Sequence, residues 1–221
     1  MQDKPRTPGA LRARRWVGPL TPLLAAAAAL FVGALMLLSL GADPVLAYSA
    51  MVEGAFGSPN AIADTLVKAT PLLFVGIGIC VAFRGGVVNI GGEGQLIAGA
   101  LAATLVSLAF PGAPALALLP MALTLGFLAG AVWGAIPGLL KAHLRVNEIL
   151  TTIMLNQIAV QGMNYLLRGP LMDPIQVEQG SFIPQTARFP LAADLPRLIP
   201  TRLHLGALLA VLAAVVIWAL L

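Results

Sequence analysis

Charged residues are scarce in this sequence. Of its 221 residues only 10% are charged, whereas 59% are hydrophobic, and the mean hydropathy is +0.92. A soluble globule of this length needs more charged side chains than that to cover its surface. The composition therefore excludes a water-soluble protein and predicts an integral membrane protein.

The chain also lacks the residue patterns of common catalytic and cofactor sites. Its single cysteine, Cys80, cannot form an internal disulfide, and His143 and His204 have no metal-ligand spacing around them. None of the three lysines follows a glycine, which excludes a G-x-x-x-x-G-K-S/T phosphate loop, and no G-x-S-x-G motif occurs. We therefore expect a chain that is not an enzyme and binds no cofactor or metal, so that any ATP is hydrolysed by a partner subunit.

Basic residues give the chain a net charge of +4, but they lie at the edges of apolar runs rather than in one patch. This distribution indicates orientation in a bilayer and argues against nucleic acid as a partner. The positive-inside rule favours a cytoplasmic N-terminus, because the regions that would then lie inside hold eight basic residues. These are Lys4, Arg6, Arg12, Arg14, Arg15, Arg84, Lys141 and Arg145.

Long uncharged segments predict an all-α, polytopic membrane protein, at ~20 apolar residues for each transmembrane helix. The first segment exceeds the ~7 to 15 apolar residues of a secretory signal, so we expect a retained span, with cleavage near "VLAYSA" as the alternative. The proline-rich residues 169–202 are expected to form an extracytoplasmic loop. About six spans are expected, near residues 20–42, 66–84, 94–110, 115–140, 148–168 and 203–221.

A glycine-rich polar stretch, "GGVVNIGGEGQLIAGA" at residues 85–100, interrupts the apolar pattern between the second and third spans. The uncharged run before it has only 15 residues between Lys68 and Arg84, and a helix of that length reaches ~22 Å, short of the ~30 Å core. The second span must therefore take in flanking polar residues or end inside the membrane. Such interrupted segments are typical of transporter substrate sites. A plain cytoplasmic hairpin is the alternative.

Glycines recur every fourth residue in the fourth span, at Gly126, Gly130, Gly134 and Gly138. Four small residues at this spacing form a groove along one helix face, where a neighbouring helix can approach closely. The groove is either an interface that moves during transport or a site of simple close packing.

Polar residues change face along the fifth predicted span. Glu148, Thr151, Thr152 and Asn156 share one face of its first half, and Gln157, Gln161, Asn164 and Tyr165 lie roughly opposite in its second half. Such a helix is either central in a bundle or lines a water-filled path. The alternative is that the amides are hydrogen-bonding contacts between helices.

Three blocks of the sequence resemble the permease subunits of ATP-binding-cassette importers, in the branch that serves nucleosides and simple sugars and is related to ribose and branched-chain amino-acid permeases. They are "ATPLLFVGIGICVAFRGGVVNIGGEGQLIAGALAA", the glycine-rich fourth span and "VNEILTTIMLNQIA". The resemblance implies a multi-pass, all-helical protein of the bacterial inner membrane that works by alternating access. It also implies three kinds of partner: ATPase subunits, a second permease subunit and an extracytoplasmic substrate-binding protein.

Residues near the translocation pathway are also implied by this resemblance. Asn89, Glu93 and Gln95 would lie along the pathway, with Asn147, Glu148, Thr152 and Asn156 on a facing helix. Family members continue beyond the segment that matches residues 203–221, so a truncated, inactive permease is one alternative expectation. A non-transporting membrane scaffold or assembly partner is the other.

Overall fold

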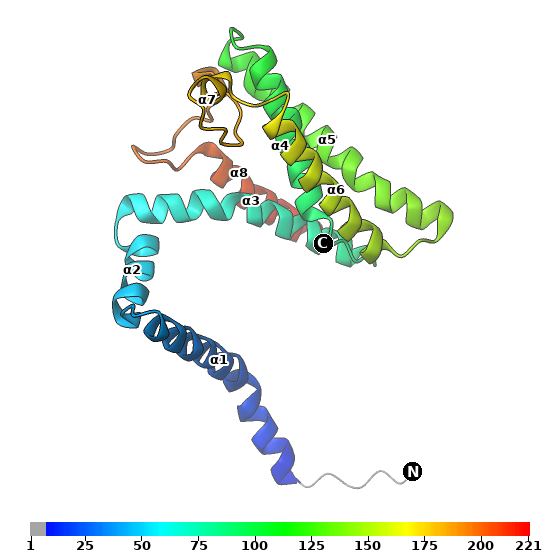
Figure 1. Cartoon of the computed structure of the whole chain (residues 1–221). Helices are drawn as coiled ribbons and strands as arrows, with labels where there is room; N and C mark the ends of the chain where they lie inside the picture. Colours follow the sequence, from blue (N-terminus) through cyan, green and yellow to red (C-terminus); the bar gives the residue numbers. More distant parts are fainter. Residues whose placement is uncertain (1–7) are drawn as a thin grey trace. The chain divides into compact units, whose positions relative to one another are not determined.

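The computed structural model describes the backbone of residues 8–221 and the side chains of residues 20–221, and within this part of the chain it contains no β-strand. Arg197 and His204 form an isolated bridge. The expected all-α fold is confirmed. The helices are α1 (Pro8–Ser39), α2 (Pro44–Phe56), α3 (Pro59–Arg84), α4 (Gly92–Ala109), α5 (Ala115–Leu144), α6 (Glu148–Arg168), α7 (Pro174–Glu178), the 3₁₀ turn η1 (Leu191–Ala193) and α8 (Leu205–Leu220) (Figure 1).

The chain divides into two compact units, residues 1–62 and 63–221, and the boundary falls inside α3. In the first unit α2 begins at Pro44, whose missing N–H is no loss at a helix start, and Asp43 accepts hydrogen bonds from the next backbone N–H groups. The Tyr48 hydroxyl donates to the carbonyl oxygen of Leu30 at 2.6 Å and thereby joins α2 to α1. The six predicted spans do not include α2. The basic side chains from Lys4 to Arg15, on which the orientation argument depends, lie outside the described side chains.

Four helical segments in the described chain are long and apolar enough to cross a membrane. They are Leu20–Ser39 of α1, α3, α4 and α5, and most of their side chains are not covered by protein. A polytopic membrane protein is therefore confirmed. Helix α6 is long enough but carries polar side chains along its length, and α8 has only 16 residues. Six spans remain a prediction.

Helices α4, α5 and α6 form the α4–α5–α6 bundle, in which α4 packs along α5 and α6 covers both. The "PGAP" turn separates α4 from α5, as expected from its proline and glycine content. Three residues connect α5 to α6: Arg145 ends α5 in a left-handed conformation with φ of 53°, and Asn147 caps α6. Lys141 and Glu148 form an ion pair across this turn.

Helices α3 and α8 lie side by side and run in the same direction (Figure 1). Near their starts Arg202 lies 4.0 Å from the Asp64 carboxylate, and at their ends the Arg84 guanidinium donates to the carbonyl oxygen of Leu221. Helix α3 has 26 residues, so it is about 39 Å long. It begins at Pro59 rather than near residue 66. The short apolar run is therefore extended by the flanking polar residues, which is the first of the two alternatives expected for the second span.

Candidate functional site

The glycine-rich stretch breaks the helix between α3 and α4, as the sequence predicts. Residues 85–91, called the discontinuity below, are not helical. Gly86 has a φ of 74°, in the left-handed region that favours glycine. Within the discontinuity Asn89 Oδ1 accepts a hydrogen bond from the Gly91 N–H at 2.8 Å. Helix α4 starts at Gly92, two residues before the predicted start.

Asn156 of α6 holds the start of α4 through both atoms of its amide. Its Nδ2 donates to the Ile90 carbonyl oxygen at 3.0 Å, and its Oδ1 accepts from the Gly94 N–H at 2.9 Å. The first N–H groups of a helix have no partner within the helix, so this side chain supplies one. Asn156 is only 7% exposed, so water has little access to its side chain. We call this pair of hydrogen bonds the Asn156 bridge.

The glycines at the start of α4 allow three other helices to approach it closely. A Cβ at Gly92 would lie 2.6 Å from Val75 Cγ1 of α3, and one at Gly94 would lie 2.8 Å from Trp133 Nε1 of α5 and 2.9 Å from Asn156 Oδ1 of α6. These distances are too short for a real side chain. The glycine pair therefore packs the start of α4 against its neighbours in addition to ending the preceding helix.

The discontinuity reaches into the bundle rather than staying at its end. Gly91 lies beside Thr152, and Gly94 is bonded to Asn156. These α6 residues come four and eight positions after Glu148, so they lie about 6 Å and 12 Å along the helix. The Lys141–Glu148 ion pair lies at the end of the bundle where α5 and α6 are connected. Helix α4 thus begins one to two helical turns further into the bundle than this ion pair. This depth favours a discontinuity inside the bundle over a plain hairpin.

Three of the four glycines in α5 face α4. A Cβ at Gly126 would lie 3.1 Å from the Gly99 carbonyl oxygen, one at Gly130 would lie 3.1 Å from the Gln95 carbonyl oxygen, and one at Gly134 would lie 2.9 Å from Gln95 Nε2. A Cβ at Gly138 would meet no atom within 4 Å. The glycines therefore mark a close α4–α5 contact that ends before Gly138.

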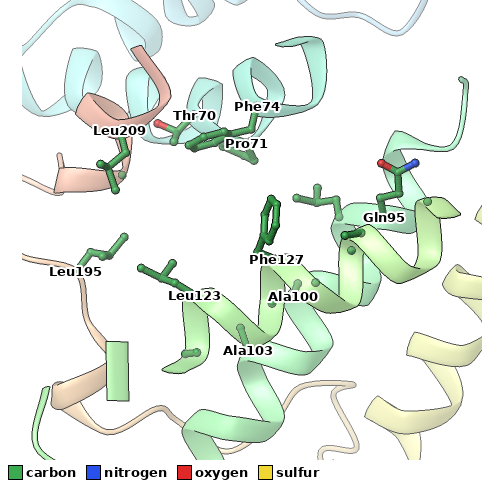
Figure 2. Close-up of a pocket in the computed structure, with 18 of the residues that line it drawn as sticks. Thr70, Pro71, Phe74, Gln95, Ala100, Ala103, Leu123, Phe127, Leu195 and Leu209 are labelled. Carbon is green, nitrogen blue, oxygen red and sulfur yellow. The ribbon is translucent and has the colours of Figure 1, made fainter. Parts of the chain in front are cut away.

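A cavity of about 930 Å³, called the main cavity, lies between α3 and α8 on one side and α4 and α5 on the other (Figure 2). Its volume suits a small-molecule ligand, and its walls are mostly apolar, as in many ligand sites. Four polar side chains line it: Thr70, Asn89, Gln95 and His204. A smaller cavity of about 160 Å³, also lined by Asn89 and Gln95, lies against Gly78 and Gly92.

The pathway residues implied by the resemblance lie in different surroundings in the structure. Asn89 and Gln95 line both cavities, whereas Glu93 is exposed and lines neither. The remaining candidates do not line these cavities either. Asn156 forms the bridge, the Thr152 hydroxyl donates to carbonyl oxygens of its own helix, Asn147 caps α6, and Glu148 pairs with Lys141. Their roles in transport stay predictions.

Several cavity residues were not identified from the sequence, among them Thr70, Pro71, Phe74, Phe127 and His204. The spacing of Thr70, Pro71 and Phe74 places them on one face of α3, but apolar residues at helical spacing do not distinguish a cavity wall from a lipid-facing surface. Trp133 was missed as well. Its Nε1 is buried and has no hydrogen-bond partner in the described part of the chain.

The polar side chains in the second half of α6 do not line these cavities. Gln161, Asn164, Tyr165 and Arg168 line a separate hollow of about 510 Å³ with Gly169. Tyr165 is 73% exposed. The two polar faces of α6 therefore differ in environment, because the first is packed against α4 and the second is open.

Comparison with known proteins agrees with the expected resemblance. The chain is 41% identical over 211 residues to the glucose ABC transporter permease protein of Haloferax volcanii, covering 90% of this chain and 54% of that protein. It is 40% identical over 199 residues to the guanosine ABC transporter permease protein of Bacillus subtilis, with 90% and 56% covered. It is 31% identical over 201 residues to the nucleoside ABC transporter permease protein NupB of Lactococcus lactis, with 89% and 55% covered.

The chain thus spans about half the length of the curated relatives it matches. No solved structure matches it. Residues 61–221, which include the discontinuity, the main cavity and the α4–α5–α6 bundle, match the family described as branched-chain amino acid transport system / permease component. The chain belongs to this family of permease components, and its apolar helices make it a multi-pass membrane protein.

Proposed function

We propose that the chain is the permease subunit of an ATP-binding-cassette importer and provides the translocation path for nucleosides or related simple sugars. The main cavity beside the discontinuity is the observation that carries this proposal, because it places the accessible amides of Asn89 and Gln95 in a space of ligand size. The names of the relatives, which refer to glucose, guanosine and nucleosides, give the substrate range.

The packing around the main cavity supports an alternating-access mechanism. The α4–α5–α6 bundle is tightly joined by glycine contacts and the Asn156 bridge. Helix α3 meets it at Val75 against Gly92, while the main cavity separates much of α3 and α8 from α4 and α5. Movement of α3 and α8 relative to the bundle, about the discontinuity, would open or close the cavity. The chain binds and orients substrate in this scheme and performs no bond chemistry.

The proposed importer needs partners that this chain does not supply. ATPase subunits on the cytoplasmic side would drive the movement, a second permease subunit would complete the path, and an extracytoplasmic binding protein would deliver substrate. In this arrangement the chain lies in the plasma membrane with its N-terminus in the cytoplasm. The turn between α5 and α6 would then face the ATPases, with Lys141, His143 and Arg145 near it.

Uptake of labelled substrate tests the proposed pathway. In cells that produce the chain with its partners, Gln95→Ala should reduce uptake of labelled guanosine or glucose at least about tenfold, the effect of losing roughly 1.4 kcal/mol of binding free energy. The matched control is Gln179→Ala, an exposed glutamine after α7 that lines no described cavity, and it should leave uptake unchanged. Equal uptake by Gln95→Ala and the parent chain would remove the main cavity from the pathway. If the chain is purified in mild detergent and no ATPase subunit is recovered with it, the scaffold alternative is favoured.

Labelling from water tests whether the main cavity is hydrated. In a Cys80→Ala background, which removes the single exposed thiol, Gln95→Cys should react with a membrane-impermeant maleimide, and bound substrate should slow the reaction. Gly91 is a poor position for this test, because a Cβ there would lie 3.0 Å from Asn89 Oδ1 and 3.2 Å from Thr152 Cβ. A reaction at Gln95→Cys whose rate no substrate changes would contradict a substrate-binding cavity.

A further inference from the structure

Aromatic side chains stand on both walls of the main cavity. Phe74 lines it from α3 and Phe127 from α5. Phe127 is 76% exposed, and Figure 2 shows its ring rising from α5 toward the face of α3 that carries Pro71 and Phe74. An exposed ring that protrudes into a cavity can pack face to face against a flat ligand. The middle of the main cavity therefore has a surface suited to a planar apolar group.

Free hydrogen-bonding groups gather at one place in the cavity wall. Asn89 and Gln95 lie together, since both line the small cavity next to Gly92 as well as the main cavity. The Gln95 amide makes no hydrogen bond within the described part of the chain, so it offers two donors and one acceptor. Asn89 Oδ1 accepts a hydrogen bond from the Gly91 N–H, and the NH₂ group of Asn89 remains free to donate.

The other two polar side chains of the main cavity already form hydrogen bonds within the chain. The Thr70 hydroxyl donates to the Leu66 carbonyl oxygen at 2.8 Å, and His204 Nδ1 accepts from the Gly206 N–H at 3.1 Å. A free hexose carries hydroxyl groups around its whole ring, so several of them would face apolar walls without partners. Unpaired hydroxyls are costly in such a site, and the cavity is therefore poorly matched to a hexose.

A nucleoside base distributes its polarity differently from a hexose. Its two faces are apolar and can stack on aromatic rings, while its edge carries adjacent donors and acceptors. Amide side chains pair with such an edge through two hydrogen bonds, one donated and one accepted. The protruding ring of Phe127 and the free amide of Gln95 match these two requirements.

We propose that the main cavity binds the heteroaromatic base of a nucleoside, with the base stacked on Phe127 and its edge paired with Gln95 and Asn89. Phe127 is then a specificity-determining residue that selects nucleosides over free hexoses. The inference rests on the proposed function for the location of the site, and it adds the class of ligand and the residue that selects it.

Direct binding tests this selection independently of transport. The full chain, purified in lipid nanodiscs, should bind labelled guanosine, and unlabelled adenosine should displace it, whereas ribose and glucose at the same concentration should not. Phe127→Ala should weaken guanosine binding roughly tenfold, the scale of losing one base–aromatic stack. Phe127→Tyr keeps a stacking ring and should bind as the parent chain does. Phe83→Ala is the matched control, because Phe83 is an exposed phenylalanine of α3 outside the cavity.

Either of two results would overturn the inference. One is displacement of guanosine by glucose or ribose as effective as that by adenosine, and the other is guanosine binding that Phe127→Ala leaves unchanged. Absence of guanosine binding to the parent chain, with glucose uptake in cells, would also overturn it while the importer function stands. Selective guanosine binding without uptake of any substrate by cells with the full set of partners would support the site and refute the proposed function.

Discussion

Replacing Asn156 by leucine should lower the free energy of unfolding by at least about 1 to 3 kcal/mol, because a buried backbone N–H loses its partner at that cost and a partly buried carbonyl oxygen loses its partner as well. The groups are the Ile90 carbonyl oxygen and the Gly94 N–H, which the Asn156 bridge now satisfies. Leucine has the same number and branching of side-chain heavy atoms as asparagine, so the substitution leaves no cavity and the loss reports the hydrogen bonds. Reversible unfolding in mixed detergent micelles measures it.

The same helix offers a matched control for Asn156. Asn164 lies eight residues further along α6, lines the open hollow and makes no hydrogen bond within the described part of the chain. Asn164→Leu should therefore cost less than about 0.5 kcal/mol, as is usual for substitutions that break no contact. Equal losses for the two variants would show that the Asn156 bridge does not hold the start of α4. Uptake should also fall in Asn156→Leu, since the discontinuity depends on that bridge.

The sequence was sufficient to predict where the chain leaves the helical pattern. Charge spacing and the "PGAP" turn place α4 and α5 to within a few residues of their observed bounds, because apolar length and proline act locally. The start of α3 was less accurate. Its first ten residues, from Pro59 to Lys68, include polar side chains that a search for uncharged runs cannot assign to a membrane helix.

The candidate site was harder to predict, because it depends on which helices meet. Asn89 and Gln95 are implied as pathway residues by the family resemblance, and both line the main cavity. Thr152 and Asn156 have the same polarity, yet their hydrogen-bonding groups are used by backbone atoms. A polar residue in a membrane helix thus has the same sequence signature whether it binds a ligand or a neighbouring helix. Only the contacts separate the two roles.

The glycines in α5 are evenly spaced in the sequence, but the atoms that surround them differ from one position to the next. Gly126 meets backbone, since a Cβ there would lie 3.1 Å from the Gly99 carbonyl oxygen and one at Gly99 would lie 2.9 Å from the Gly126 carbonyl oxygen. The atoms nearest to a Cβ at Gly134 would belong to the flexible Gln95 side chain. Gly138 faces open space. The three positions should therefore respond differently to the same substitution.

Leucine at Gly126 should cost about 3 kcal/mol or more, the upper part of the range for overpacking, because neither backbone can move without separating α4 from α5. Gly138→Leu is the matched control and should leave the free energy of unfolding nearly unchanged.

Gly134→Ala should cost little stability but reduce uptake, since its methyl group displaces the Gln95 amide from the cavity wall. Unfolding in mixed micelles and uptake in cells measure the two effects separately. Equal stability losses at Gly126 and Gly138 would contradict the observed contact, and a large loss of stability with intact uptake in Gly134→Ala would contradict the role of Gln95.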